Sequence, residues 1–238
     1  MKKIIFYYKA LLFVLDLFYR GILILFLPRK LLNKYFTKIA NNWAKRLVQI
    51  AHVNIEIIGL DRFDPKGNYI FTANHSSMFD IPILMSIVKS SFRIIYKKEL
   101  EKIFFFGPVM KRTPFISVIR DNSKNAMQSV QLALKEIQSG TSVMIWPEGT
   151  RSEDGSLGEF KRGAFYLAAR SGKPIVPVTI INAYKILPKG RLEFKSGVNV
   201  KVIFDEPIEC PENMDRIQEK EMMNSIKQII GNNIELYS

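Results

Sequence analysis

Apolar positions dominate the first fifty residues and follow a helical repeat there. Residues 10–27 form an apolar run that only Asp16 and Arg20 interrupt. These two residues stand four positions apart, so on a helix they share a face and can form an ion pair. Pro28 then ends the helix, and residues 29–53 repeat apolar side chains at helical spacing. The pattern therefore predicts two successive helices, the second of them amphipathic.

From Val53 onward, short apolar stretches alternate with helical repeats. Strands are predicted at 53–58, 68–73, 91–96, 115–119, 141–146, 175–181 and 198–204. Helices are predicted at 77–90, 123–139, 164–171 and 212–230. Strands separated by helices indicate an α/β fold with a mixed, largely parallel sheet flanked by helices. We expect this domain to occupy residues 53–238, preceded by the helical pair at residues 1–52.

Basic residues are concentrated in the helical pair. Residues 1–46 contain ten lysines and arginines against one acid, Asp16, and so contribute +9 of the net charge of +13. Aromatic residues interleave with these cations, a combination that anionic lipid surfaces attract. Nucleic acid also attracts basic proteins, but here the charges flank an apolar segment instead of lining a polar face. The pattern favours lipid over nucleic acid.

Three placements of the helical pair fit the sequence. The pair lies in one leaflet of a membrane, crosses it as a single span, or packs on the domain as two core helices. The run at 10–27 is at the lower edge of the about 20 residues that cross a bilayer, and it carries two charges. A leaflet-bound pair is the preferred interpretation, with a single span close behind. A signal peptide is not expected, since no small-residue cleavage site follows the run.

Cysteine and metal chemistry find little support in the composition. The single cysteine, Cys210, cannot form an internal disulfide and suits a reducing compartment. It has no histidine near it in sequence, so we do not expect it to be a nucleophile. No cluster of histidine, cysteine or carboxylate residues has the spacing of metal ligands, and we expect neither a metal nor a cofactor.

A histidine and an aspartate lie five positions apart where a predicted strand leads into a helix, in the segment NHSSMFD at residues 74–80. His75 is suited to remove a proton from a hydroxyl group. Asp80 is suited to fix the imidazole tautomer and to stabilise the cation that forms. No Gly-x-Ser-x-Gly segment is present, so Ser76 and Ser77 are interpreted as helix caps or hydrogen-bond donors. The pair alone is a weak signal, because such spacings arise by chance.

A second motif, WPEGTRS at residues 146–152, follows a predicted buried strand. Arg151 offers a bidentate fork for a phosphate group, and Gly149 lets the backbone approach it. Glu148 is expected to orient Arg151 or to bind an acceptor hydroxyl. Arg120 is a further candidate for the phosphate, with a surface ion pair to Asp121 as the alternative. Both motifs end strands, where α/β sheets bind their ligands, so we expect one shared cleft.

These segments resemble the glycerolipid acyltransferase family, and within it the 1-acylglycerol-3-phosphate acyltransferases. The similarity spans about residues 68–178 and contains four blocks in family order, at 74–80, 115–120, 146–152 and 175–178. The resemblance implies that His75 and Asp80 are catalytic. It also implies that Arg120, Glu148, Gly149, Thr150 and Arg151 lie at the acceptor, whose phosphate the arginine-bearing blocks contact in that family, with Pro177 shaping the pocket.

Two departures from the family pattern stand out. Trp146 occupies a position that is usually phenylalanine. In the second block, Pro114, Ser117 and Ile119 replace the usual residues. The second departure weakens the assignment of Arg120 and of the acceptor headgroup.

The predicted function is transfer of a fatty acyl chain from acyl-CoA or acyl carrier protein to the sn-2 hydroxyl of lysophosphatidic acid, giving phosphatidic acid. The expected location is the cytoplasmic face of the inner membrane. One alternative keeps this chemistry and changes the acceptor to another lyso-lipid, such as a lyso-ornithine lipid. A second alternative is a non-catalytic basic membrane-binding module, which explains the charge but not the two motifs.

Overall fold

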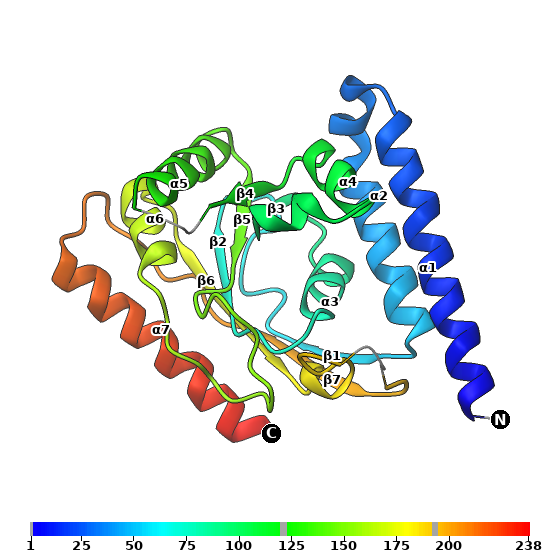
Figure 1. Cartoon of the computed structure of the whole chain (residues 1–238). Coiled ribbons are helices and arrows are strands. Elements are labelled where there is room, and N and C mark those ends of the chain that lie inside the picture. Colours follow the sequence, from blue (N-terminus) through cyan, green and yellow to red (C-terminus); the bar gives the residue numbers. More distant parts are fainter. Residues whose placement is uncertain (1, 120–122, 192–194) are drawn as a thin grey trace.

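One seven-stranded sheet organises the residues that the computed structural model describes, which are 2–119, 123–191 and 195–238 (Figure 1). The strands are β1 (Asn54–Ile58), β2 (Ile70–Ala73), β3 (Phe92–Lys97), β4 (Ile116–Val118), β5 (Ser142–Ile145), β6 (Ile175–Ile181) and β7 (Asn199–Phe204). Their order is β1-β7-β6-β2-β5-β3-β4. Only the β6–β7 pair is antiparallel. The predicted α/β fold with a mixed, largely parallel sheet is confirmed.

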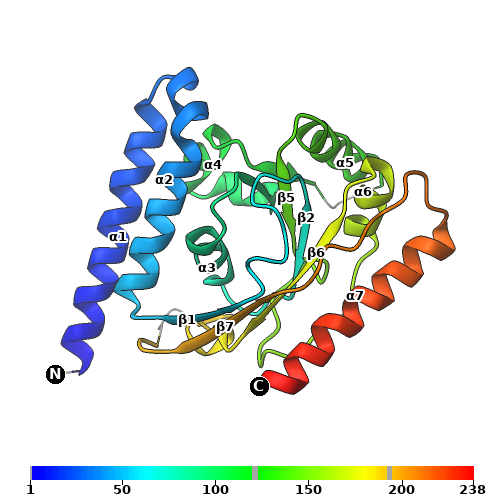
Figure 2. The same cartoon turned by 180° about the vertical axis from the view of Figure 1, so that it is seen from behind.

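Helices cover both faces of this sheet. They are α1 (Lys2–Phe26), α2 (Arg29–Ile50), α3 (Asp80–Ile87), η1 (Lys98–Lys102), α4 (Phe106–Arg112), α5 (Ser123–Gln138), α6 (Gly163–Ser171), η2 (Ala183–Lys185) and α7 (Arg216–Tyr237). One apolar core lies between the sheet and α2 and α3, and a second lies between the sheet and α5, α6 and α7. Figures 1 and 2 show α1 and α2 together at one end of the molecule and α7 at the other.

Alternation along β2 explains how one strand serves both cores. Phe71 and Ala73 point into the core under α3, whereas Ile70 points into the core under α6. Successive side chains of a strand face opposite sides of the sheet, so a strand covered on both faces is apolar throughout. All four residues of β2 and all seven of β6 are buried. These continuous apolar runs are what made the central strands predictable.

The two charged residues that interrupt the apolar run of α1 are turned inward, against α2. Asp16 pairs with Arg20 at 2.9 Å, which confirms the predicted ion pair, and with Arg46 of α2 at 3.0 Å. A small apolar cluster of Ile24, Leu32, Phe36 and Val109 holds the two helices against α4. The charges that interrupt the apolar run therefore fasten α1 to α2.

The opposite side of α1 carries large apolar side chains that remain exposed. We call this set the α1 apolar face; its members are Tyr7, Tyr8, Leu11, Val14, Leu15, Phe18, Tyr19, Ile22 and Phe26. A side so rich in exposed apolar groups is unusual for a helix that packs only on its own domain. In the described part of the chain, no helix combines the length and the apolarity that crossing a bilayer requires. The prediction of a single span therefore finds no candidate helix there.

Four helices differ from the prediction. No element was predicted in the segment 98–112, which forms η1 and α4. Helix α3 begins at Asp80, after an N-cap residue, Phe79, that makes no side-chain cap, so Ser76 and Ser77 are not helix caps. Helix α7 continues to Tyr237 and starts with a capping box between Asp215 and Gln218.

Candidate active site

His75 and Asp80 meet in the loop that joins β2 to α3. The Nδ1 atom of His75 lies 2.7 Å from Oδ2 of Asp80. The same oxygen accepts the backbone N–H groups of Ser76 at 2.8 Å and Ser77 at 2.9 Å. Because an ionised carboxylate only accepts hydrogen bonds, it fixes the tautomer with the proton on Nδ1 and leaves the lone pair on Nε2. The imidazole is thereby set up as a base.

His75 and Asp80 differ in how far their side chains are exposed to solvent. Asp80 is fully buried, whereas the His75 side chain keeps 17% of its surface exposed. The carboxylate is therefore shut away behind the imidazole, and the imidazole alone offers a surface to a substrate. This arrangement matches an orienting acid behind a general base.

Asn74 anchors the start of this loop, a role that the sequence did not reveal. Its Nδ2 donates to the carbonyl of Ile180 at 2.9 Å, and its Oδ1 accepts the N–H of the same residue at 2.7 Å. The buried amide side chain thus ties the end of β2 to β6. An asparagine directly after a buried strand is the only sign of this in the sequence.

The second motif is joined to the first by hydrogen bonds. The N–H of Ser152 donates to the carbonyl of His75 at 2.8 Å. Glu148 accepts the N–H of His75 at 2.7 Å through Oε1 and the N–H of Gly158 at 2.8 Å through Oε2. Because β2 and β5 are parallel neighbours, both motifs leave the sheet at the same edge. The structure thus brings together the two segments that the sequence predicted to share one cleft.

Glu148 is a positioning residue in this arrangement. Both of its oxygens are engaged by backbone N–H groups, and one of those belongs to His75. Burial raises the pKa of this carboxyl group above its usual value, while the two backbone hydrogen bonds act in the opposite direction. The expected contact of Glu148 with Arg151 is absent from the described contacts, and the carboxylate holds the backbone of His75 instead.

The remaining predicted acceptor residues differ in placement. Gly149 adopts φ +70°, a conformation that favours glycine, and so closes the turn after Trp146. Thr150 is exposed and Arg151 is partly buried. They occupy the two positions before Ser152, whose backbone N–H is bonded to the carbonyl of His75. Arg120 lies outside the described residues. Pro177 sits in β6, in register with Thr72 of β2.

Trp146 packs beside the His75 imidazole. The two ring centroids are 5.0 Å apart, with 32° between the ring planes. The indole is buried, and its N–H has no hydrogen-bond partner among the described residues. The sequence had marked Trp146 only as a departure from the family pattern. Its contact with His75 depends on the pairing of β2 with β5, which brings together two residues that are 71 positions apart in the sequence.

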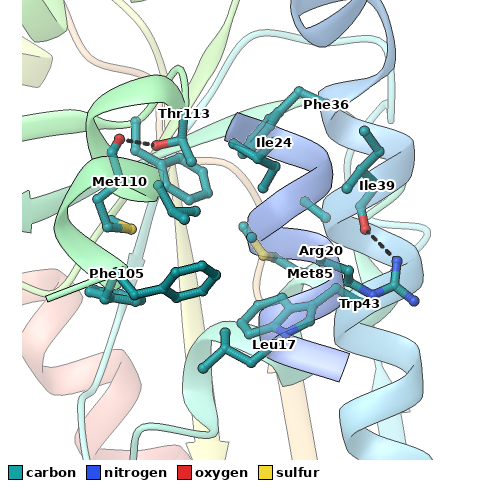
Figure 3. Close-up of a pocket in the computed structure, with 15 residues that line it drawn as sticks. Leu17, Arg20, Ile24, Phe36, Ile39, Trp43, Met85, Phe105, Met110 and Thr113 are labelled. Carbon is teal, nitrogen blue, oxygen red and sulfur yellow. Dashed lines mark hydrogen bonds between the residues drawn. The ribbon is translucent and has the colours of Figure 1, made fainter. Parts of the chain in front are cut away.

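An apolar cavity lies between the helical pair and α4 (Figure 3). Its lining residues are Leu17, Arg20, Gly21, Ile24, Phe36, Ile39, Ala40, Trp43, Met85, Phe105, Phe106, Val109, Met110, Thr113 and Phe115. The polar ends of Thr113 and Arg20 are bound to the carbonyls of Met110 and Ile39. The indole N–H of Trp43 is buried without a partner among the described residues, and the other lining side chains are apolar.

Helix α3 links this cavity to the His75–Asp80 pair. Met85 lines the cavity five residues after Asp80, which is about 7.5 Å along the helix. The cavity was not predicted, because α4, which forms one of its walls, was not predicted.

Cys210 is a buried core residue and not a candidate nucleophile. It is buried in the core under α6 and α7, and burial raises the pKa of its thiol to about 11, with Glu219 and Glu209 adding to the effect. A thiol with so high a pKa is not a nucleophile at neutral pH. Within the described ranges, no three histidine, cysteine or carboxylate residues are grouped so that they could hold a metal ion.

Comparisons with known proteins point to one family. A family model described as "Acyltransferase" matches residues 54–181. A chloroplast 1-acyl-sn-glycerol-3-phosphate acyltransferase of Arabidopsis thaliana is 34% identical over 178 residues, covering 74% of this chain and 49% of the relative. A probable enzyme of the same name from Mycoplasma pneumoniae is 30% identical over 184 residues, covering 73% and 68%. The chain thus spans about half the length of the plant relative.

A solved structure is similar over nearly the whole chain. It is the crystal structure of the 1-acyl-sn-glycerophosphate acyltransferase PlsC from Thermotoga maritima. The TM-score is 0.75 at 26% sequence identity, and the match covers 98% of this chain and 92% of that one. The match therefore includes the N-terminal helices as well as the sheet.

Proposed function

We propose a function from the premise that this chain belongs to the acyltransferase family. It transfers a fatty acyl chain from a thioester donor, acyl-CoA or acyl carrier protein, to the sn-2 hydroxyl of lysophosphatidic acid, and it releases phosphatidic acid. One observation carries the proposal. The His75–Asp80 pair and the turn that bears Arg151 are fastened to each other by the hydrogen bonds of Ser152 and Glu148.

The reaction follows from the orientation of His75. Nε2 removes the proton from the acceptor hydroxyl, whose oxygen then attacks the thioester carbonyl carbon. The tetrahedral intermediate collapses with cleavage of the carbon–sulfur bond, and the imidazolium returns the proton to the departing thiolate. Asp80 stabilises the imidazolium between these two steps. No covalent enzyme intermediate is needed.

The acceptor and the acyl chain have separate places in this proposal. Arg151, beside the bonded Ser152, binds the acceptor phosphate through its planar fork, and Gly149 and Thr150 let the backbone come close. The apolar cavity behind α3 suits one acyl chain, because its wall is almost free of polar groups. Arg120 is carried as a further phosphate ligand from the resemblance alone.

Attachment to a membrane fits the acceptor and the product, which are both lipids. We place the α1 apolar face in one leaflet at the cytoplasmic face of the inner membrane, with the lysines and arginines of α1 and α2 near anionic headgroups. The inward-facing Asp16 and Arg20 leave that face without charge.

The test is acyl transfer by purified protein in detergent, with labelled acyl-CoA and labelled acyl carrier protein offered in turn to lysophosphatidic acid. Wild type and His75→Asn are compared. The matched control is His52→Asn, since His52 is the second of the two histidines, is exposed, and has a positive φ that asparagine tolerates. We expect phosphatidic acid from wild type and from His52→Asn only.

Each other outcome has a definite meaning. Full activity of His75→Asn contradicts the mechanism. If the wild type is folded but inactive with lysophosphatidic acid, it is tested with other lyso-lipids, and activity with one of them identifies the acceptor. Inactivity with all of them contradicts the enzyme and favours a non-catalytic membrane-binding module.

A further inference from the structure

The turn between η1 and α4 presents two apolar side chains to solvent. Phe104 is 94% exposed and Ile103 is 50% exposed. The turn is tight: the N–H of Phe106 bonds to the carbonyl of Phe104, and the N–H of Gly107 bonds to that of Ile103, both at 2.7 Å. We call Ile103 and Phe104 the 103–104 tip. Exposure of a phenylalanine to this degree costs solvation free energy without any return in packing.

Phe105 fixes the tip to α1. Its backbone has φ +61°, an unfavourable conformation for a bulky residue, which persists only where contacts hold it. Its ring stacks on Phe18 with a centroid distance of 4.3 Å. It also lies so close to Gly21 that a Cβ there would come within 2.6 Å of the ring. Gly21 is therefore the residue that lets the turn seat against the helix.

This seating makes the tip continuous with the α1 apolar face. Phe18, which carries the stacking contact, is itself 44% exposed and belongs to that face. In Figures 1 and 2, α4 lies beside the helical pair and away from α7. The tip thus extends the apolar face sideways, off the axis of α1.

Lysines accompany the tip. Lys98 and Lys102, both exposed, stand on η1 directly before it. Lys97 and Lys111 lie nearby and are paired with Glu99 at 3.4 Å and Glu101 at 3.9 Å. Apolar side chains next to exposed lysines complement an anionic bilayer, which accepts the former below its headgroups and attracts the latter. In a loop that faces only water, the two apolar side chains would cost solvation free energy and contribute nothing to stability.

We propose that the 103–104 tip inserts into an anionic lipid bilayer as a second contact beside α1 and so orients the domain over the membrane. This inference rests on the membrane attachment in the proposed function. A lone helix lying in the interface can roll about its own axis, and a contact to one side of that axis prevents rolling. Phe105 and Phe106, which follow the tip directly, line the apolar cavity. Insertion therefore holds the cavity wall at the bilayer surface.

The first test measures binding to vesicles of phosphatidylcholine with phosphatidylglycerol, by sedimentation. Phe104→Ser is compared with Leu236→Ser, which removes an apolar side chain that is 73% exposed on α7, a helix that belongs neither to the helical pair nor to the 103–104 tip. We expect Phe104→Ser to lower the partition coefficient about tenfold and Leu236→Ser to leave it unchanged. Equal binding by the two variants overturns the proposal and favours a protein as the partner of the tip.

A second measurement reports insertion directly. Phe104→Cys and Leu236→Cys are labelled with an environment-sensitive dye, which the buried Cys210 does not take up. On vesicles, the emission of the label at position 104 should shift to the blue and be quenched by brominated lipids, and that at 236 should do neither. An unshifted label at 104 overturns the proposal even where variant folding is in doubt.

Lys98 and Lys102 allow an independent test of the contact with anionic lipid. Lys98→Gln combined with Lys102→Gln should weaken binding to anionic vesicles about tenfold and leave binding to pure phosphatidylcholine unchanged. Equal losses on both vesicle types contradict the assignment of these lysines to anionic headgroups.

Activity separates this inference from the proposed function. Phe104→Ser should acylate a short-chain, monomeric lysophosphatidate as fast as wild type, but should be slower with an acceptor embedded in vesicles. If wild type acylates neither acceptor, the proposed function fails, and the vesicle-binding measurements still decide the role of the tip. A loss on both acceptors shows that the tip acts through the active site and overturns the orienting role.

Discussion

Asp80 and Asp16 are both buried carboxylates, and their surroundings set them apart. Asp80 shares one oxygen between two backbone N–H groups and an imidazole that still touches solvent. Asp16 lies between two guanidinium groups, one from its own helix and one from α2. An imidazole can gain and lose a proton near neutral pH, whereas a guanidinium stays charged.

The comparison shows that burial alone does not define the role of a carboxylate. In the proposed reaction, Asp80 faces a group whose charge changes during proton transfer, so its free energy of interaction changes along the reaction. Asp16 faces two permanent cations, so its interaction is the same at every stage. We therefore assign Asp80 to chemistry and Asp16 to the attachment of α1 on α2.

The largest expected effect sharpens this contrast. Asp80→Asn should lower kcat for lysophosphatidic acid by about 10³–10⁴-fold, because an amide neither holds the imidazole in the right tautomer nor stabilises its cation. The amide oxygen can still accept the two backbone N–H groups, so the melting temperature should change little. Kinetics and thermal denaturation of the same preparation check both parts. A variant that loses stability and keeps its activity would contradict this assignment, because Asp80 would then have a structural role like that of Asp16.

Asp16→Asn should show the opposite pattern. It leaves Arg20 partly buried without a carboxylate partner, with only the carbonyl of Ile39 still bonded to it, while Arg46, 59% exposed at its side chain, can turn to water. Full loss of a buried pair costs about 3–5 kcal/mol, so we expect about 2 kcal/mol here, or about 4–8 °C in Tm. Thermal denaturation in detergent measures this, and activity on a monomeric acceptor should remain. A loss of activity at unchanged Tm would contradict the assignment.

Glu148→Gln tests the link between the two motifs. An amide offers one acceptor atom where two backbone N–H groups are bound, so one of them is left unsatisfied at a cost of about 1–3 kcal/mol. Displacement of the His75 backbone should lower kcat about tenfold, with the KM for the acyl donor nearly unchanged.

Gly158→Ala provides the matched variant for this link. A Cβ at Gly158 would come within 2.7 Å of the Glu148 carboxylate and disturb the same contact from the other side. It should lower kcat in the same direction as Glu148→Gln. Activity equal to wild type in both variants would show that Glu148 does not position His75.

The smallest expected effect is a pH dependence of stability. The folded-state pKa of Glu148 is raised above the ordinary value of 4.5, so the folded protein binds this proton more tightly than the unfolded chain. Between about pH 4.5 and the raised pKa, the free energy of unfolding therefore falls as pH rises. We expect Glu148→Gln to remove this part of the slope, less than about 1.4 kcal/mol per pH unit. Melting temperatures of both proteins across this range measure it, and parallel curves would contradict the assignment.

Local sequence predicted the elements whose partners lie close in the chain. His75 and Asp80 are five residues apart and meet across a single loop, so their spacing was informative. The central strands were predictable because burial on both faces makes them apolar throughout. By contrast, Asp16 and Arg46 become neighbours only when two helices pack.

Two features escaped prediction for identifiable reasons. The partners of Glu148 are backbone N–H groups, which every residue except proline possesses, so no side chain in the sequence points to them. The segment that contains Ile103 and Phe104 has an unbroken apolar run without helical period, followed by Gly107 and Pro108, which indicate a turn. Proline is tolerated in the first turn of a helix, and α4 places Pro108 there.

The pairing of β1 with β7 governs the order of events during synthesis. β1 carries the helical pair, and its described hydrogen-bonding partner is the last strand, with Asn54 in register with Asn199, 145 residues later. At about 5–20 residues per second, the ribosome takes roughly 7–30 s to cover that distance. During this interval the helical pair has left the ribosome while the edge of the sheet to which it is joined has yet to be made. The nascent chain thus exposes the long apolar helix α1 early, and the sheet closes only after β7 has been made.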